Sequence, residues 1–213
     1  MCVAGEIIGI VERKERRKES LRQEILDAAR DILLAEGYAK LSMRGIAERI
    51  EYSPTTIYSY FRNKEEILHH LCEEALERQL SVIQKAGRDK PSPVPRLRAE
   101  LRAYIDFGLS EPGRYQIVYM ADLSQYVSMA SILEEGSPAF RLRELIRREI
   151  DDVLGNTGGD LDTETISQAV WAHCHGIVSL LIGRPDFPWV DRERLIETGL
   201  DILLSGLNRR MVR

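Results

Sequence analysis

Ser53-Pro-Thr-Thr-Ile-Tyr-Ser-Tyr-Phe-Arg-Asn-Lys64, in a chain of 213 residues, contains the clearest helix start signals of the sequence. The residue before a proline prefers extended backbone, and a serine hydroxyl can accept hydrogen bonds from the free amides of a helix start. Pro54 suits the first helical position, where an amide donor is not needed. A second start signal, a capping box of the Asx type, follows at Asn63. The stretch therefore predicts one helix over 54–60 and another from 63 to 85 or 86.

Two amphipathic segments precede this stretch. Residues 16–36 place leucine, isoleucine and alanine on one stripe of a helix, and residues 43–50 do the same after Ser42, which can cap that helix. A longer helix followed by two short helices across a tight turn at 51–52 is typical of a helix-turn-helix unit. The second short helix of such a unit, here 54–60, enters the major groove of DNA. The pattern predicts DNA binding by the amino-terminal part of the chain.

The helix over 54–60 can present a polar face to DNA when Ile57 and Phe61 turn inward. Small side chains at its start can approach base edges, and hydroxyl groups suit phosphate oxygens. The starts of the neighbouring helices also attract phosphate, which is why we include Arg44 and Lys64, although a solvated surface charge is the alternative for both. The predicted DNA-contact residues are Ser42, Arg44, Ser53, Pro54, Thr55, Thr56, Tyr58, Tyr60 and Lys64.

Charge is unevenly distributed along the chain. The formal net charge is −4, yet residues 11–64 hold 12 Lys and Arg against 9 Asp and Glu, and the remainder holds 18 against 25. A basic run, Arg13-Lys-Glu-Arg-Arg-Lys18, precedes the first predicted helix and could follow the DNA backbone or reach into the minor groove. A solvated run of charge is the alternative.

Helical periodicity continues to the end of the chain, broken at proline, glycine and asparagine clusters. The predicted fold class is all-α, with about nine helices and no sheet. Residues 121–137 are ambiguous, and three prolines within 87–95 indicate a linker and a domain boundary. The further helices are expected at 96–110, 112–120, 138–155, 162–183 and 191–211.

The amino-terminal motifs resemble the TetR family of bacterial transcriptional repressors, in spacing as well as in residue type, over residues 22–68. The resemblance implies an all-helical homodimer with a DNA-binding domain at 16–68, preceded by a flexible segment at 1–15. A larger domain at 69–213 would bind a small-molecule effector and form the dimer, and no cofactor is expected. The matching stretches are Arg22-Gln-Glu-Ile-Leu-Asp-Ala-Ala29, Glu36-Gly-Tyr38, Leu41-Ser-Met-Arg44, Ile46-Ala47, Ser53-Pro-Thr-Thr-Ile-Tyr58 and Tyr60-Phe-Arg-Asn-Lys64.

Two positions depart from the family's pattern. Glu51 stands in the turn where members often have glycine, which puts an easy left-handed turn in doubt. Gly45 stands where members often have an acidic residue, and glycine inside a helix costs up to about 1 kcal/mol. Neither departure removes a group expected to contact DNA.

Aromatic residues gather in the second half of the chain and can line a mostly apolar pocket with a few polar groups, although simple core packing is the alternative. Trp171-Ala-His-Cys-His-Gly176 resembles the Trp and His-Gly signature of one type of TetR regulatory domain. The predicted effector-contact residues are Tyr104, Phe107, Tyr115, Tyr119, Phe140, Trp171 and His175.

The last two predicted helices, 162–183 and 191–211, are expected to pair with their counterparts in a second chain as a four-helix interface. Helix 162–183 carries apolar residues on two stripes, so it needs neighbours on two sides. Helix 191–211 carries a stripe with two small members that would let another helix approach closely. The members of that stripe are Leu195, Gly199, Ile202 and Gly206.

Other classes of function find little support. Cys2, Cys72 and Cys174 are scattered without metal-ligand spacing, and His173 and His175 point away from each other on a helix, so no metal site is expected. The motifs of hydrolases, zinc proteases and nucleotide-binding enzymes are absent from the sequence, which disfavours an enzyme on a small apolar substrate.

Without a signal peptide or an apolar run of bilayer length, we expect a cytoplasmic protein. The preferred interpretation is a dimeric repressor that a small, largely apolar effector releases from a palindromic operator of double-stranded DNA. An activator or a ligand-independent DNA-binding protein stays as the alternative.

Overall fold

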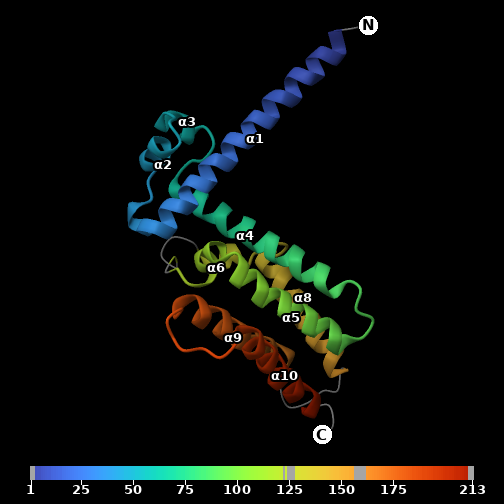
Figure 1. Cartoon of the computed structure of the whole chain (residues 1–213). Helices are drawn as coiled ribbons and strands as arrows, with labels where there is room; N and C mark the ends of the chain where they lie inside the picture. Colours follow the sequence, from blue (N-terminus) through green and yellow to red (C-terminus); the bar gives the residue numbers. More distant parts are fainter. Residues whose placement is uncertain (1–2, 122, 124–127, 156–161, 211–213) are drawn as a thin grey trace. The chain divides into compact units, whose positions relative to one another are not determined.

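The computed structural model describes residues 3–121, 123, 128–155 and 162–210, which are drawn in colour in Figure 1. Over these residues the chain has ten α-helices, one 3₁₀-helix and no strand, which confirms the predicted all-α class. The described residues form two compact units, one built from residues up to Leu71 together with Leu123, and the other built from Cys72 onward.

The first unit consists of a long helix, the helix-turn-helix and the start of a further helix. The first helix begins at Val3, well before the predicted start at residue 16. Residues 12–19 are all Glu, Arg or Lys, which form helices readily but show no apolar stripe, so periodicity alone did not include them. Met1 and Cys2 lie outside the described residues. The elements are α1 (Val3–Glu36), η1 (Tyr38–Lys40), α2 (Met43–Arg49), α3 (Pro54–Tyr58) and α4 (Lys64–Gly87).

Both short helices of the first unit begin as the sequence predicts. The Ser42 hydroxyl accepts a hydrogen bond from the amide of Gly45 at 3.0 Å, and the Ser53 hydroxyl accepts one from the amide of Thr56 at 3.2 Å. Pro54 occupies the first turn of α3. Apolar side chains from four helices, with Phe61 from the segment between α3 and α4, close the core of this unit. Its buried residues include Ile25, Leu26, Ala29, Ile46, Ala47, Ile57, Phe61, Ile67 and Leu68.

The turn between α2 and α3 places Glu51 in the left-handed region, with φ of 60°. A residue with a side chain is strained at positive φ, whereas glycine is not. The chain therefore keeps the left-handed turn expected with glycine, and Glu51 adopts it at a cost in backbone strain. The amide of Tyr52 bonds to the carbonyl of Ala47 at 2.9 Å, which closes the turn.

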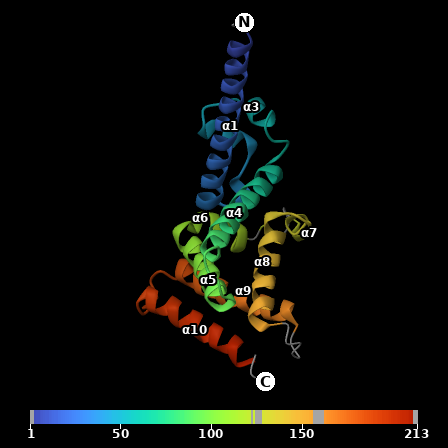
Figure 2. The same cartoon turned by 90° about the vertical axis from the view of Figure 1, so that its right-hand side faces the viewer.

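The second unit contains the remaining helices, and four of them surround α5 (Figure 2). The ambiguous segment 121–137 contains one short helix, which raises the number of α-helices from the expected nine to ten. The segment 87–95, predicted as a domain boundary, instead joins α4 to α5 inside this unit. The elements after α4 are α5 (Pro93–Ser110), α6 (Pro112–Tyr119), α7 (Met129–Ile132), α8 (Pro138–Leu154), α9 (Thr163–Gly183) and α10 (Arg192–Arg210).

Gly108 lets α6 and α9 approach α5 closely. A Cβ at this position would lie 2.5 Å from Cγ1 of Val178 and 2.9 Å from the ring of Tyr115. Both neighbours are fully buried in the apolar core of the unit. A larger residue at position 108 would therefore push apart the two helices that carry Tyr115 and His175.

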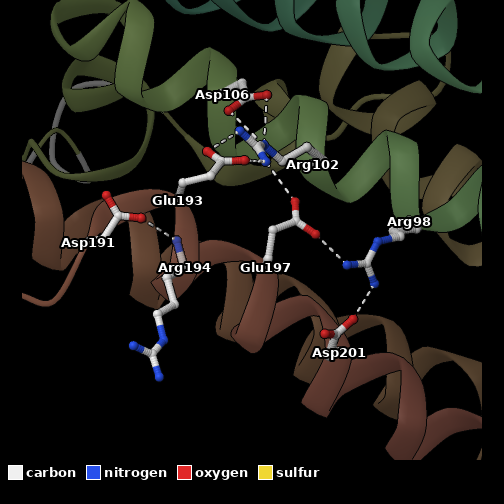
Figure 3. Close-up of polar contacts among 8 residues, drawn as sticks. All are labelled: Arg98, Arg102, Asp106, Asp191, Glu193, Arg194, Glu197 and Asp201. Carbon is white, nitrogen blue, oxygen red and sulfur yellow. Dashed lines mark hydrogen bonds and ion pairs between the residues drawn. The ribbon is translucent and has the colours of Figure 1, made fainter.

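An ion-pair network fastens α10 to α5 (Figure 3). Arg102 bonds to Glu193 and to Glu197, and Arg98 bonds to Glu197 and, at 2.6 Å, to Asp201. The two arginine side chains are about one-third exposed or less. Shared carboxylates make this a network rather than a set of isolated surface pairs, so it orients α10 on the core.

α9 is long and apolar enough, by length and composition alone, to cross a membrane. One side of it, formed by Ile166, Val170, Cys174 and Val178, is buried in the core of the second unit. A core helix of a globular unit passes the same test, so the composition of α9 is weak support for a membrane span.

Candidate DNA-binding surface and effector site

α3 presents the polar face that the sequence predicts. Ile57 and Phe61 are buried, whereas Pro54, Thr55 and Tyr58 are exposed, with Tyr58 exposed to 57%. A large aromatic side chain that the fold leaves in solvent, one turn from a small threonine, is free to contact another molecule. This face offers two side-chain hydroxyls and no charge.

Three predicted contact residues have their side-chain oxygens engaged within the helix starts. The hydroxyl groups of Ser53 and Thr56 lie 2.9 Å apart, and both Ser42 and Ser53 accept backbone amides as N-caps. Ser42 and Ser53 therefore stabilise the starts of α2 and α3. Removing such a cap lowers the free energy of unfolding by about 1 kcal/mol.

Lys64 is held above an aromatic ring. Its ammonium group lies 4.1 Å from the ring centroid of Tyr38, and the Tyr38 hydroxyl donates to Glu65 at 2.7 Å. That hydrogen bond lowers the pKa of Glu65, so the carboxylate stays charged beside the lysine. The Arg44 side chain, in contrast, is 83% exposed and lies 3.3 Å from Glu48, which is 71% exposed, so this ion pair contributes little to stability.

The amino-terminal extension of α1 forms an open groove with the helix-turn-helix. The groove has a volume of about 420 Å³, and α1 supplies three basic side chains to it together with the carboxylate of Glu24. The sequence predicted the basic run and Tyr60 separately, but it did not predict that Tyr52 and Ser59 lie opposite them. Its lining residues are Lys14, Arg17, Lys18, Ser20, Leu21, Glu24, Tyr52, Ser59 and Tyr60.

Five of the seven predicted effector-contact residues lie together in the second unit. The hydroxyl oxygens of Tyr104 and Tyr115 lie 2.9 Å apart, within hydrogen-bond distance. The Tyr115 hydroxyl oxygen also lies 2.8 Å from Nδ1 of His175. Trp171 donates its indole N–H to the Tyr104 hydroxyl at 3.0 Å. The Tyr119 ring contacts the rings of all four, with centroids 4.7 to 6.2 Å away. We call these five residues the aromatic cluster.

Burial sets the charge state of the aromatic cluster. It raises the pKa values of Tyr104, Tyr115 and Tyr119 above the ordinary tyrosine value, and it lowers the pKa of His175. All of these side chains are therefore neutral near pH 7. Trp171 is the most exposed member, at 49%, so the cluster reaches the surface of the unit there.

Phe107 and Phe140 are not part of the aromatic cluster. Phe107 is buried in the general apolar core, and Phe140 is half-buried in the first turn of α8. Gln79 was not predicted from the sequence. It is fully buried on α4 and accepts a hydrogen bond from the Tyr119 hydroxyl at 2.6 Å. Its place between the apolar positions Leu76 and Leu80 could have indicated a buried polar side chain.

The predicted dimer stripe on α10 faces in more than one direction. A Cβ at Gly199 would lie 2.9 Å from Cδ1 of Ile177 of the same chain, so this glycine allows α9 and α10 of one chain to pack closely. Leu195 is half-buried. Ile202 is 67% exposed, and a Cβ at Gly206 would meet open space. Ile202 and Gly206 are therefore the most exposed members of the stripe.

Cys174 has the environment of a structural residue. Burial raises the pKa of its thiol to about 12, which leaves almost no thiolate at neutral pH. Across the described residues, no three His, Cys, Asp or Glu side chains are arranged to hold a metal ion. Nothing in these surroundings activates Cys174 as a nucleophile.

Known proteins share both the sequence and the fold. A repressor, HTH-type transcriptional repressor KstR of Rhodococcus jostii, is 31% identical over 99 residues, which cover 46% of this chain and 45% of KstR. An activator, HTH-type transcriptional activator FasR of Mycolicibacterium smegmatis, is 26% identical over 49% of this chain and 48% of FasR. The chain thus matches about half the length of these two relatives.

A solved structure, that of the fatty acid degradation regulator FadR from Bacillus halodurans, superposes with a TM-score of 0.70 at 21% identity. The superposition covers 87% of this chain and 95% of FadR, and at this identity it shows the fold alone.

Two family models match separate parts of the chain, and together they cover most of it. The model of bacterial regulatory proteins of the tetR family matches residues 25–71, which contain the helix-turn-helix. The model of the tetracyclin repressor-like C-terminal domain matches residues 97–203, which contain the aromatic cluster and half of the chain. The chain belongs to the TetR family of DNA-binding transcriptional regulators.

Proposed function

We propose that this regulator is a cytoplasmic, dimeric repressor that leaves a near-palindromic operator when a small, largely apolar effector binds. The observation that carries the proposal is the exposed face of α3, where Thr55 and Tyr58 stand in solvent on a helix anchored by the buried Ile57. Membership of the family supplies the general activity, and this face supplies the groups that would read the operator.

On DNA, α3 would lie in the major groove with Thr55 near base edges. Tyr58 and Lys64 would contact phosphate, and the cap residues Ser42 and Ser53 would keep the two helix starts in place. The groove beside α1 would accept the DNA backbone next to the site, since Arg17 and Lys18 line it together with residues of the helix-turn-helix.

The dimer would form through the outward faces of α9 and α10. Trp171 and Leu180 on α9 and Ile202 on α10 are large apolar side chains that are about half exposed or more. Gly176 and Gly206 leave open space where another helix can approach. Two α3 helices in such a dimer would need a separation of about 34–36 Å, or a multiple, to enter successive major grooves.

Effector binding at the aromatic cluster would favour a conformer whose α3 helices no longer match the operator. By linkage, an effector that lowers the affinity for DNA binds the DNA-free dimer more tightly. α4 carries Lys64 at its start and Gln79 fifteen residues later, so one helix contributes to both proposed sites.

The proposal is tested by selecting the genomic fragments that the purified full chain binds at fixed salt. We expect a two-fold symmetric sequence to be enriched, and we expect Thr55→Ala to change which bases are preferred. Fragments enriched without any common sequence, or a chain that stays monomeric at micromolar concentration, would contradict the proposal.

Repression and activation are separated by a reporter placed behind the selected operator. The relatives support both directions, since KstR is named a repressor and FasR an activator. We expect reporter output to rise when the gene for this chain is deleted. A fall in output would assign activation instead.

A further inference from the structure

The aromatic cluster contains a chain of hydrogen bonds whose direction is fixed at one end. An indole N–H can only donate, so Trp171 donates to the Tyr104 oxygen. The Tyr104 hydroxyl then donates to Tyr115, and the Tyr115 hydroxyl donates to Nδ1 of His175. This order gives each hydroxyl proton an acceptor, which the reverse order does not.

The direction of the chain decides which tautomer His175 adopts. Because Nδ1 accepts a hydrogen bond, the neutral imidazole carries its proton on Nε2. Burial keeps the ring neutral by lowering the pKa of His175. No acceptor for this N–H is present among the residues that the structure describes.

A second donor lies next to the same cluster. Gln79 is 0% exposed, its carbonyl oxygen accepts from Tyr119, and its amide nitrogen Nε2 is buried with no hydrogen-bond partner in the described part of the chain. A buried amide donor without an acceptor is destabilising, so a group that accepts from it would be bound favourably. The Tyr119 hydroxyl donates to Gln79, and the Tyr119 ring lies 6.1 Å from the His175 ring between centroids, so one tyrosine contacts both donor residues.

The cluster offers no charge to balance an ionised effector. Its tyrosines and its histidine are neutral near pH 7, and glutamine and tryptophan carry no charge. Burying a carboxylate or an ammonium group there without a partner would be unfavourable. The chemistry that fits is a neutral molecule that accepts hydrogen bonds and does not donate them.

We propose that the effector is a neutral carbonyl compound, such as a ketone, ester or lactone, whose oxygen accepts from Nε2 of Gln79, with Nε2 of His175 as the second donor. The rings of Tyr119 and Trp171 would cover its apolar body. This inference rests on the proposed effector site and names the class of molecule that the site selects.

Two bicyclic probes of nearly the same shape test the inference by titration calorimetry on the full chain. The first, 1-indanone, only accepts hydrogen bonds, and the second, indole, only donates them. We expect 1-indanone to bind about tenfold or more tightly than indole, because indole leaves the buried amide donor without an acceptor. Equal affinities, tighter indole binding or no heat from 1-indanone would overturn the inference.

The variant Gln79→Met keeps the length of the side chain but removes the amide donor, and unlike a buried glutamate it cannot carry a proton in its place. We expect the preference for 1-indanone to disappear in Gln79→Met and to persist in Gln84→Met, the same change at an exposed position of α4. Thermal melts identify any variant that fails to fold, and in that event His175→Phe, which removes the second donor, must reduce the preference. A preference that survives in every folded variant at positions 79 and 175 would overturn the inference.

The same samples separate this inference from the proposed function. Binding of the selected operator is measured without any probe. If the unmodified chain binds the operator but shows no preference for 1-indanone, only the inferred effector class is wrong. If the unmodified chain shows no sequence-specific operator binding, the proposed function is wrong, whatever the result with the probes.

Discussion

The ammonium group of Lys64 lies 4.1 Å from the centroid of the Tyr38 ring, at the first residue of α4. A lysine above a ring is restricted in the positions it can adopt, and the interaction is worth about 0.5–1 kcal/mol at a partly exposed site. The pair therefore orders a cation at a helix start, where a phosphate is also favoured. Tyr38 is outside the residues predicted to contact DNA, yet it positions one of them.

Replacing Lys64 by alanine should weaken binding to specific and non-specific DNA alike. One fewer phosphate contact should reduce the slope of log affinity against log salt by about 1. The measurement is a set of binding titrations between low and moderate salt.

Two variants make this prediction sharper. Lys64→Arg keeps the positive charge, so the slope of log affinity against log salt should stay the same. Tyr38→Phe keeps the aromatic ring below Lys64 and loses only the hydrogen bond to Glu65. An unchanged salt slope in a folded Lys64→Ala variant would show that Lys64 interacts with the Tyr38 ring but not with phosphate.

Thr55→Ala should change the sequence preference rather than the affinity for DNA in general. Thr55 is exposed on α3 and small enough to meet a base edge or a thymine methyl group, and such contacts discriminate between bases by about 1–3 kcal/mol. Titrations on a series of operators, each changed at one base pair, measure the effect. A uniform loss at every operator would exclude Thr55 as a base contact.

Tyr58→Phe should have the complementary effect. The variant loses one hydroxyl suited to a phosphate oxygen, so all duplexes should bind more weakly by about 0.5–1.5 kcal/mol with their ranking unchanged. Because the hydroxyl belongs to an exposed side chain, the melting temperature should stay the same. A changed ranking would place Tyr58 at the bases.

The groove beside α1 predicts a longer DNA footprint than the helix-turn-helix alone would give. Replacing both Arg17 and Lys18 by alanine should shorten the nuclease footprint and reduce the salt slope by about 2. Arg16→Ala is the matched control, since Arg16 is exposed on the same helix but does not line the groove.

Glu24 allows the opposite test of the same groove. Glu24 lines the groove, and its negative charge would repel phosphate, so Glu24→Gln should strengthen binding. Identical footprints and slopes in all these variants would rule out the groove as a contact.

Glu100 should make the stability of the second unit depend on pH. Glu100 is 2% exposed, and burial, aided by the nearby Glu149, raises the pKa of its carboxyl to about 7 despite the attraction of Arg96 and Arg148. The folded chain then holds a proton that the unfolded chain releases near pH 4.5. The free energy of unfolding should therefore fall between about pH 4.5 and 7, by up to about 3 kcal/mol, and stay low above pH 7.

The isosteric Glu100→Gln variant cannot lose a proton and should remove that fall. Denaturant unfolding at pH 5 and at pH 8 measures it, and we expect the variant to exceed the unmodified chain in stability mainly at pH 8. The same difference at both pH values would contradict a titration of Glu100.

Local sequence signals predicted the elements of the first unit well because their causes are local. Ser53 and Pro54 define the start of α3 within four residues of chain, and the structure confirms both roles. The early start of α1 was missed because residues 12–19 carry only charged side chains and show no apolar stripe. The left-handed backbone of Glu51 was also not predictable from local residue preferences, because glutamate rarely adopts positive φ and the packing of the turn imposes it.

Contacts between distant segments could not be predicted from local patterns. The small size of Gly199 indicated that a helix approaches, but only the fold shows that this helix is α9 of the same chain. Likewise, the buried amide of Gln79 becomes meaningful only when α6 brings Tyr119 to it. The aromatic cluster was predicted in part because its residues are rare and large, whereas a single glutamine is common.

In the proposed function, two copies of α3 read one operator. Titrating the full chain at one fixed salt concentration onto a labelled duplex with the selected sequence, and onto a scrambled duplex, tests this arrangement, with the stoichiometry measured by analytical ultracentrifugation. We predict two chains for each duplex and an affinity about a thousandfold or more above that for the scrambled sequence. Equal affinity for the two duplexes, or a single chain bound to the operator, would show that two copies of α3 do not read one operator.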